Sequence, residues 1–322
     1  MRSGPPADQP GPHARSQAGD SAAPSHHLHG GTVLPAARQH KLRFGLELPH
    51  GGRVLRWRGP ALMGVVNVTP DSFSDGGERF DEGRAVAAGL ALHAAGARVV
   101  DVGGESTRPG AAPVSEAEER RRVVPVVEAL AEAGVIVSID SRNPEVVRSA
   151  LEAGARIVND IGGLRLPRMR EVAAAAGAPV VAMHMQGEPR TMQREPVYDD
   201  VVREVREFLL AAAAAALMAG VPDVMLDPGI GFGKKVSHNL ELLSRLEALT
   251  AGEHAVLVGA SRKSSIAAIA GPAEPKERLP GTLVMHLRAA DAGAAMLRVH
   301  DVAEHVQALK VWGALQGTEY VT

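Results

Sequence analysis

The chain of 322 residues contains no cysteine, and this absence excludes disulfides, thiolate catalysis and thiolate metal sites together. Aromatic residues are scarce, with two Trp, two Tyr and five Phe, so the stacking platforms of single-strand binders are missing. The formal net charge is −2, from 35 Lys and Arg against 37 Asp and Glu, which argues against nucleic-acid binding through a basic face. We therefore expect small-molecule partners and no nucleic acid.

The sequence also lacks a long hydrophobic run. The longest one, residues 208–221, falls short of the ~20 residues that a membrane span needs. Its six consecutive alanines favour a helix inside a soluble fold instead. The start of the chain, Arg2 followed by Ser-Gly-Pro-Pro, has no apolar core of a signal peptide. Together with the missing cysteines, these features predict a cytoplasmic protein without a membrane partner.

Two regions differ sharply in composition. Of the first 40 residues, 22 are Ala, Pro, Gly or Ser, and few large aliphatic side chains could form a core. Such a segment cannot offset its ordering entropy, so residues 1–41 are predicted to be a disordered tail and residues 42–322 the folded domain. Alternating runs at 42–48 and 53–57 flank Gly51-Gly52 and predict a β-hairpin at the start of that domain.

Beyond the hairpin, short apolar runs alternate with amphipathic segments. The expected strands are residues 61–66, 97–102, 135–139, 155–158, 179–183, 224–226, 255–258 and 294–299. The expected helices are residues 82–95, 115–133, 144–153, 167–177, 198–220, 237–249, 280–292 and 301–315. Runs that are apolar almost throughout are typical of strands buried on both faces of a parallel sheet. Eight such units predict an α/β fold, a (β/α)8 TIM barrel, with an open doubly wound sheet as the alternative.

A polar or ionisable group follows each of the eight expected strands. These groups are Asn67, Asp101, Asp140, Asn159-Asp160, His184, Asp227, Ser261-Arg262-Lys263, and Arg298 with His300-Asp301. Any single Asp or Asn at such a place could be an ordinary helix cap, but the cations are poor caps. In a barrel all these ends meet at the face that carries the active site. Carboxylates and amides beside cations suit a flat heterocycle attached to an anion.

Two other chemistries are disfavoured. The glycine-rich run from Gly229 to Lys234 superficially resembles a phosphate loop, but it lacks the required spacing, and Lys235 stands where Ser or Thr would hold Mg²⁺. That spacing argues against a nucleotide triphosphatase. No His-x-His ends a strand and no His-Glu-x-x-His helix is present, so a zinc hydrolase is not expected.

Several motifs, in order along residues 42–317, resemble the dihydropteroate synthases of folate biosynthesis. They include Met63-Gly-Val-Val-Asn-Val-Thr-Pro-Asp-Ser-Phe-Ser-Asp-Gly-Gly77, Gly103-Gly-Glu-Ser-Thr-Arg-Pro-Gly110, Ser138-Ile-Asp140, Leu226-Asp-Pro-Gly-Ile-Gly-Phe-Gly-Lys234, Ser261-Arg-Lys-Ser264 and Arg298-Val-His-Asp-Val302. The resemblance implies a pterin-binding barrel that joins 6-hydroxymethyl-7,8-dihydropterin diphosphate to 4-aminobenzoate, giving 7,8-dihydropteroate and diphosphate. It also implies Mg²⁺ as cofactor and a homodimer as the assembly.

The resemblance further implies a role for individual residues. The pterin ring would be held by Asp140, Asn159, Asp227 and Lys263, with Met183 and Gly259 also in the substrate site. The diphosphate would meet Thr107, Arg298 and His300, with Mg²⁺ on Asn67. The 4-aminobenzoate site would be lined by Arg108, Pro109, Phe232 and Ser264, with Phe73 closing over it. The catalytic set would be Asp140, Lys263, Arg298 and His300.

The implied mechanism neutralises the departing diphosphate with Mg²⁺, Arg298 and His300. The aminobenzoate nitrogen would then attack a pterin cation that Asp140 stabilises, without a strong general base. Two alternatives remain, a pterin-dependent methyltransferase barrel and a non-catalytic pterin-binding paralogue. His286 occupies a place where the family more often has a small residue, and we interpret it as a packing or surface histidine.

Overall fold

The computed structural model describes Met1 and residues 38–69, 81–106, 114–188 and 191–320, and the elements below belong to the unit Val33–Thr322. Residues 2–37 of the predicted tail lie outside the described residues. Strand β1 (Gln39–Arg43) begins ahead of residue 42, where the folded domain was expected to start. It pairs antiparallel with β2 (Val54–Arg58), Leu42 opposite Leu55, which confirms the predicted hairpin.

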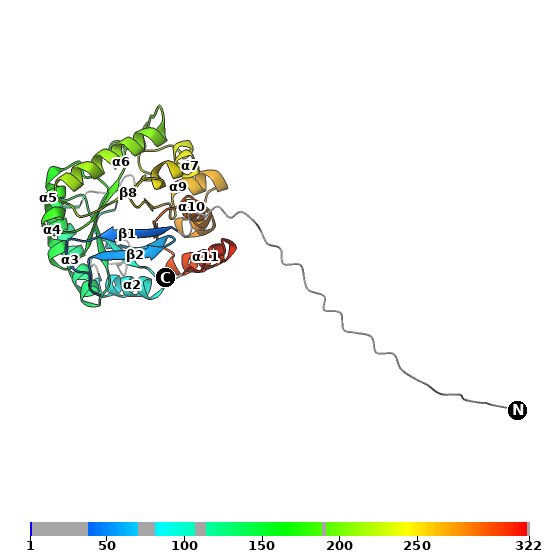
Figure 1. Ribbon diagram of the computed structural model, residues 1–322, viewed down its shortest axis with the longest axis horizontal. Coiled ribbons are helices and arrows are strands. Elements are labelled where there is room, and N and C mark those ends of the chain that lie inside the picture. Colours follow the sequence, from blue (N-terminus) through cyan, green and yellow to red (C-terminus); the bar gives the residue numbers. More distant parts are fainter. Residues whose placement is uncertain (2–37, 70–80, 107–113, 189–190, 321–322) are drawn as a thin grey trace, which may run out of the picture. The chain divides into compact units, whose positions relative to one another are not determined.

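Eight parallel strands form the barrel that the sequence predicted (Figure 1). They are β3 (Ala61–Asn67), β4 (Val99–Gly103), β5 (Val137–Asp140), β6 (Ile157–Asp160), β7 (Val180–Met183), β8 (Val224–Asp227), β9 (Leu257–Val258) and β10 (Met296–Val299). Their order in the sheet is β8-β7-β6-β5-β4-β3-β10-β9. A parallel bridge between Leu226 and Val256 joins β8 to the residue before β9, so the two ends of the sheet meet. This bridge decides against the open-sheet alternative.

Helices surround the barrel. They are α2 (Glu82–Ala94), α3 (Glu116–Glu132), α4 (Pro144–Glu152), α5 (Pro167–Ala175), α6 (Val201–Met218), α7 (Val236–Ser244), α8 (Glu247–Thr250), α9 (Ser264–Ala270), the 3-10 helix η2 (Pro275–Arg278), α10 (Leu279–Asp291) and α11 (Val302–Leu315). Side-chain caps fix several starts; the Asp200 carboxylate, for example, accepts from the backbone N–H groups of Val202 and Arg203. No helix in the described part of the chain is long and apolar enough to cross a membrane.

Helical segments on both sides of β9 differ from the predicted pattern. The segment expected as one helix over residues 237–249 is divided into α7 and α8, with Arg245 as the C-cap of the first. Helix α9 was not predicted; it spans seven residues, too few to establish a helical period in the sequence. It lies directly after Lys263 and therefore fixes the backbone of that predicted site residue.

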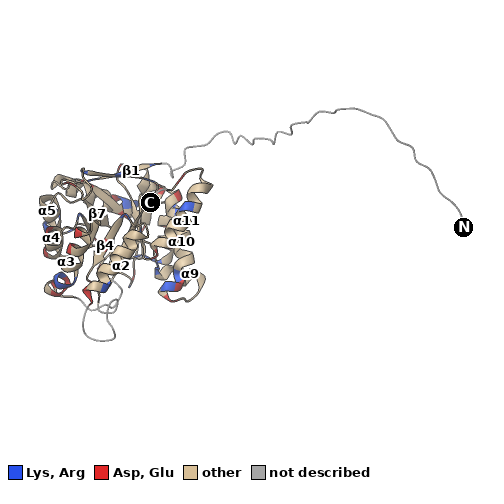
Figure 2. Ribbon diagram, turned by 90° about the horizontal axis from the view of Figure 1, so that it is seen from below, with Lys and Arg blue, Asp and Glu red and all other residues tan. Residues whose placement is uncertain are grey.

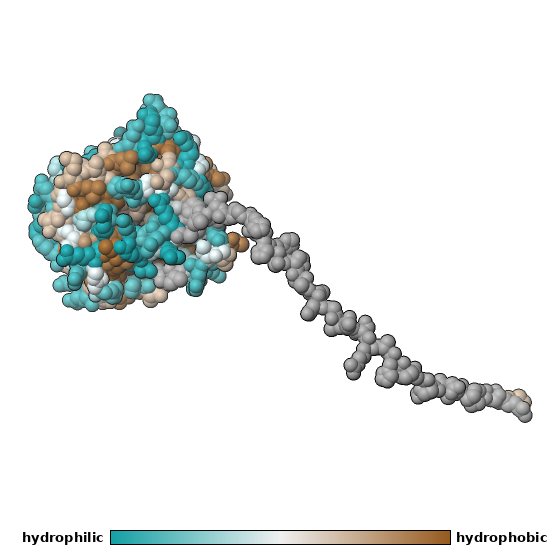
Figure 3. All heavy atoms as spheres, in the orientation of Figure 1, coloured by the Kyte–Doolittle hydropathy of each residue, from teal (hydrophilic) through white to brown (hydrophobic). Residues whose placement is uncertain are grey.

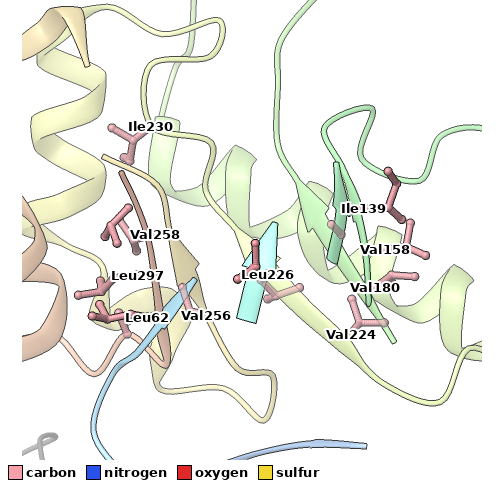
Figure 4. Close-up of a cluster of buried hydrophobic side chains, with 14 of the residues drawn as sticks. Leu62, Ile139, Val158, Val180, Val224, Leu226, Ile230, Val256, Val258 and Leu297 are labelled. Atoms are coloured by element: carbon pink, nitrogen blue, oxygen red, sulfur yellow. The ribbon is translucent and has the colours of Figure 1, made fainter. Parts of the chain in front are cut away.

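Alternate strand residues pack in two directions. Side chains such as Leu62, Ile139, Val158 and Leu297 face the helices and form the outer core, part of which is drawn in Figure 4. The inward side chains are apolar at the amino ends of the strands, where the hairpin residues Leu42, Phe44, Leu55 and Trp57 pack against them. The Trp57 indole N–H donates to the Ala295 carbonyl at 2.7 Å. The hairpin therefore closes the amino end of the barrel.

The hairpin and helix α9 lie at opposite ends of the barrel (Figure 2). On the face that carries the hairpin, hydrophilic and hydrophobic residues are interspersed (Figure 3). The carboxyl ends of the strands, together with α9, are thus left at the other end. In (β/α)8 enzymes that end carries the active site.

Candidate active site

The side chains at the barrel mouth follow from the two-residue period of the strands. An apolar inward layer is formed by Met63, Val99, Ile157, Val181, Met225, Leu257 and Met296. The residues two positions further along the same strands are Val65, Asp101, Asn159, Met183, Asp227, Gly259 and Arg298. Because strand side chains alternate, this second set also points into the barrel, one layer nearer the mouth. Most of the predicted pterin-binding residues lie in this layer.

Arg298 links two carboxylates across the mouth. Its Nε donates to Asp101 Oδ2 and its Nη2 to Asp140 Oδ2, each at 2.7 Å. Asn159 Nδ2 donates to the same Asp101 oxygen at 3.0 Å, which leaves the Asn159 carbonyl oxygen as an acceptor. Asp101 is fully buried, whereas the Arg298 side chain is 23% exposed. The buried carboxylate therefore orients a guanidinium that still reaches the open end of the barrel.

Charge and burial act in opposite directions within this network. Burial, with the neighbouring Asp101 charge, raises the pKa of Asp140, and Arg298 opposes that rise. Burial also works against the charge of Arg298, but Asp101 and Asp140 together raise its pKa above the ordinary value. The guanidinium is therefore a permanent cation, while the charged form of Asp140 is favoured by Arg298 and would be favoured further by a cationic ligand.

Asp227 and Lys263 are a second pair of residues that interact by charge, each favouring the charged form of the other. Asp227 Oδ1 accepts the Gly229 N–H at 2.7 Å, and burial raises the pKa of this carboxyl. Burial lowers the pKa of Lys263 to about 8, although Asp227 opposes the change. The Lys263 ammonium lies 4.0 Å from the centroid of the Phe232 ring. Gly231, at φ +83°, leaves room for this arrangement, because a Cβ there would lie 3.0 Å from Lys263 Cδ.

His300 lies beside this pair and is held by Ser261. Ser261 Oγ is 2.9 Å from His300 Nδ1 and also accepts the His300 backbone N–H at 3.3 Å. Burial, with the nearby charges of Arg298 and Arg262, lowers the pKa of His300 to about 3. The imidazole is therefore neutral at neutral pH. When the hydrogen is on Nε2, Ser261 donates to Nδ1 and Nε2–H can donate to an anion.

Lys234, a residue outside the predicted site, supports the loop after β8. Its buried ammonium donates to the carbonyl oxygens of His184, Gly229 and Phe232 and lies 3.0 Å from His184 Nδ1. Burial lowers the pKa of Lys234 to about 7. His184 thus supports a loop instead of lining the mouth, although it follows a strand in the sequence. The glycine-rich loop is therefore shaped around an internal cation.

The remaining predicted residues occupy different kinds of position around the mouth or lie outside the described residues. Met183 and Phe232 lie in one small apolar cluster, and Gly259 packs against Arg298, where an added Cβ would meet the arginine Cβ at 3.8 Å. Ser264 is exposed at the start of α9 and lines a cavity of about 540 Å³. Asn67, half-buried, ends β3. Thr107, Arg108, Pro109 and Phe73 lie outside the described residues.

Two residues of the network were absent from the predicted site, Asp101 and Ser261. Asp101 interrupts an otherwise apolar strand, and a charge at an inward position of a buried strand is a signal that could have identified it. Ser261 directly follows the strand region of β9, and like Asp101 it was noted only as a polar strand end. Both act on a predicted residue, Asp101 on Arg298 and Ser261 on His300.

The fold and the mouth together define a barrel enzyme that holds a polar heterocycle near an anion. Residues 63–300 match the family model of pterin-binding enzymes, which fixes the class as a pterin-binding (β/α)8 barrel. The dihydropteroate synthase of Escherichia coli (strain K12) is 49% identical over 255 residues, which cover 78% of this chain and 90% of that protein.

Solved structures agree with this relationship. The dihydropteroate synthase of Xanthomonas albilineans with 4-aminobenzoic acid superposes with a TM-score of 0.78 at 47% identity, over 83% of this chain and 97% of that one. The Thermus thermophilus enzyme in complex with 6HMPPP gives a TM-score of 0.73 at 45% identity, over 84% and 99%. The chain belongs to the dihydropteroate synthases. It is an alkyl-transferring enzyme of folate biosynthesis, which sets aside the methyltransferase and the non-catalytic paralogue.

Proposed function

We propose that this chain condenses 6-hydroxymethyl-7,8-dihydropterin diphosphate with 4-aminobenzoate at the mouth described above. The observation that carries the proposal is the guanidinium of Arg298, fixed by Asp101 and Asp140 between an amide-and-carboxylate floor and His300. The floor matches a heterocycle with donors and acceptors, and the cations match an attached anion. The complexes of relatives with 4-aminobenzoic acid and 6HMPPP support the same pair of substrates.

The pterin ring would lie over Asp227, Asn159 and Met183. Gly229 occupies Asp227 Oδ1, so Oδ2 is the oxygen that would accept ring N–H groups. The Asn159 carbonyl oxygen would accept another, because its amide nitrogen already donates to Asp101. The Lys263 ammonium would donate to the ring carbonyl. Loss of any one partner would leave a buried polar group unpaired, so the set selects strongly for the pterin pattern.

The diphosphate would lie against Arg298 and His300. Two of the three guanidinium nitrogens of Arg298 are engaged by Asp101 and Asp140, so Nη1 would donate to phosphate oxygen. His300, neutral at neutral pH, would add a hydrogen bond from Nε2. Both donors are held in place before the anion arrives, which lowers the reorganisation needed as charge develops on the leaving group. Thr107 would add a contact from the loop after β4.

Asn67 fits a magnesium ion that is shared with the substrate. Its carbonyl oxygen is the hard donor that Mg²⁺ prefers, and it ends a strand at the barrel mouth. Within the described ranges, no group of three or more His, Asp or Glu could hold a metal by itself. Phosphate oxygens and water would therefore complete the coordination. Bound there, Mg²⁺ would neutralise charge on the diphosphate.

The second substrate would enter beside Ser264 and Phe232. The cavity that Ser264 lines continues past Gly231 and Lys235, and its volume of about 540 Å³ exceeds what a single aromatic ring requires. Arg108 and Pro109 are proposed as its remaining walls. The Ser264 hydroxyl would donate to the carboxylate of 4-aminobenzoate. An aromatic amine without a carboxylate could not accept this hydrogen bond.

In the proposed reaction the bond between the exocyclic methylene and the diphosphate oxygen breaks first, and both electrons leave with the diphosphate. Asp140 then stabilises the positive charge on the pterin, because its carboxylate faces the ring from the end of β5. The amine of 4-aminobenzoate forms the new carbon–nitrogen bond and releases one proton to solvent or diphosphate. An arylamine needs no strong base toward such a cation.

A homodimer and a cytoplasmic location belong to the proposal as well. Val284, Val311 and Leu315 are large apolar residues of α10 and α11 with exposed fractions of 69%, 58% and 82%. Covering them with a second copy would remove apolar surface from water. Light scattering of the purified chain would test the homodimer, and a monomer at every concentration would contradict it.

The test of the function is diphosphate release from the purified chain. Release should require the pterin diphosphate, 4-aminobenzoate and Mg²⁺ together, and dihydropteroate should form in equal amount. The matched control is Arg298→Gln, which keeps a planar polar group and removes the charge. Release without 4-aminobenzoate would indicate a hydrolase and overturn the proposed condensation.

A further inference from the structure

Two buried histidines on neighbouring helices connect the loops that carry Lys263 and His300. His286 lies on α10 and His305 on α11, and each is about 1% exposed. His286 Nδ1 lies 2.8 Å from His305 Nε2. At the other end of the pair, His286 Nε2 accepts the Ala260 backbone N–H at 3.0 Å, and His305 Nδ1 lies 2.6 Å from the Asp301 carbonyl oxygen.

These contacts close a ring. Arg262, two residues after Ala260, forms a salt bridge to Asp301, with Nε donating to Oδ2 at 3.1 Å. The ring therefore runs from Ala260 through His286, His305 and Asp301 to Arg262 and returns along the chain. Lys263 directly follows Arg262, and His300 directly precedes Asp301. Lys263 and His300, which are proposed to touch the pterin and the diphosphate, are thus each adjacent in the chain to a residue of the ring.

The hydrogen bonds determine where the protons are. A backbone N–H can only donate, so His286 Nε2 must be the unprotonated nitrogen, and Nδ1–H donates to His305. His305 Nε2 is then the acceptor, and its Nδ1–H donates to the Asp301 carbonyl oxygen. Burial lowers the pKa of both histidines, in agreement with two neutral rings. Every polar nitrogen of the pair is engaged, so the pair has a single satisfied arrangement.

The ring holds a backbone conformation that needs support. Arg262 has φ +58°, in the left-handed region that a non-glycine residue seldom adopts. Its N–H donates to Thr282 Oγ1 and its carbonyl oxygen accepts from Arg278, both at 3.0 Å. Such strain persists where the surroundings over-determine it, commonly next to functional residues. The turn after β9 is therefore anchored on α10 from two sides, at Ala260 and at Arg262.

We propose that His286 and His305 are positioning residues of the synthase: through Ala260 and Asp301 they fix the two loops relative to each other, and so aim Lys263 and His300 at the pterin and the diphosphate. This inference rests on the roles proposed above for Lys263 and His300. Neither histidine touches substrate. Packing alone would not require the ring, because a leucine would fill the same apolar surroundings without donors or acceptors to satisfy.

The first experiment uses the unmodified chain. Nitrogen-15 NMR of the histidine side chains should show both rings neutral and protonated on Nδ1 at pH 7. A His286 ring protonated on Nε2, or charged, could not accept from Ala260 and would overturn the inference. This measurement requires no variant to fold.

The second experiment compares substitutions at His286. His286→Leu should lower kcat/KM for the pterin diphosphate by about 10- to 100-fold, the effect expected when a reacting group is displaced by about an ångström. His286→Gln, whose Oε1 can still accept from Ala260, should recover a substantial part of that loss. His40→Leu is the matched control, because His40 is a buried histidine at the hairpin end of the barrel and should leave kcat/KM within about twofold. Equal activity of all variants would contradict the inference.

A double-mutant cycle separates this inference from the function on which it rests. If His286 acts through Lys263, His286→Leu should cost much less in a Lys263→Ala background than alone. Full additivity would overturn the positioning role while leaving the role of Lys263 intact. If Lys263→Ala itself had no effect on kcat/KM, the proposed role of Lys263 would fail, and the positioning inference with it. Circular dichroism at the assay temperature verifies that each variant is folded.

Discussion

Arg298 Nη2 lies 2.7 Å from Asp140 Oδ2, and this contact joins β10 to β5 across the mouth of the barrel. The two residues are 158 positions apart in the chain. The same guanidinium forms a salt bridge to Asp101, which also accepts a hydrogen bond from the uncharged Asn159 amide. One cation thus compensates two carboxylates and still has a nitrogen left for an anionic substrate.

Removing that cation should affect stability and turnover together. We expect Arg298→Leu to lower the free energy of unfolding by about 3–5 kcal/mol, because two largely buried carboxylates lose their partner. We expect kcat to fall by roughly 10²- to 10³-fold. Urea unfolding and steady-state assays measure the two effects. Adding Asp101→Asn should restore part of the stability and none of the activity; a further loss of stability would contradict the compensation described here.

Asp227 should control affinity for the pterin. Asp227→Asn keeps the side-chain size and an oxygen that can accept from Gly229, so the loop should remain folded. The loss of one charged acceptor should weaken pterin binding by about 1–3 kcal/mol, or roughly 5- to 150-fold. Calorimetric titration with a dihydropterin lacking the diphosphate isolates this site from Arg298. Unchanged affinity would remove Asp227 from the pterin site.

Lys263 should set an alkaline limit on activity. Its pKa of about 8 in the unliganded protein means that the ammonium is present below that pH and lost above it. Because kcat/KM reports the free enzyme, its value for the pterin diphosphate should fall as pH rises through about 8. Lys263→Arg, with a group that stays charged, should lose that limb of the profile while being less active at pH 7. A wild-type profile that is flat up to about pH 9.5 would exclude this assignment.

His300 should contribute a hydrogen bond to the leaving group and not a charge. His300→Ala should lower turnover by roughly 10²-fold and spare binding of the pterin ring, while His300→Gln, which retains a donor, should lose less. Single-turnover assays separate this effect from product release. If both variants were equally impaired, the donor at Nε2 would not be the feature that matters, and the lowered pKa of His300 would need another role.

Lys234 should make stability depend on pH. Its pKa falls from 10.5 in the unfolded chain to about 7 in the folded one, so between these values the unfolded state binds more protons. The contribution of Lys234 to the free energy of unfolding therefore rises as pH increases from about 7 to 10.5. Lys234→Met should remove that dependence. It should also destabilise the protein by about 1–3 kcal/mol at pH 9, because the neutral amine present there donates to at most two of the three nearby carbonyl oxygens, and these lose their donor. Denaturation series at pH 7 and pH 9 test both effects. If the free energy of unfolding changed with pH equally in the wild type and in Lys234→Met, the lowered pKa of Lys234 would be contradicted.

Much of the fold could be predicted from local pattern alone. Apolar runs separated by amphipathic segments specify eight βα units because only a closed parallel sheet buries so many two-sided strands. The two-residue period of a strand also fixes which side chains face inward, so Asn159, Asp227 and Arg298 could be assigned to the mouth from their positions after Ile157, Met225 and Met296. The motifs added the family, which the comparisons then confirmed.

Tertiary structure alone decided which of these groups are partners. Asp101 and Arg298 come together because the barrel closes, and no local signal links a residue of β4 to one of β10. His286 illustrates the limit: the sequence suggested a packing or surface residue, and in the fold it is buried, but only the structure shows that its ring joins Ala260 to His305. Periodicity is set by neighbours along the chain, so sequence reveals it. Pairing, burial and the resulting pKa shifts depend on atoms brought together by folding, so only the folded chain determines them.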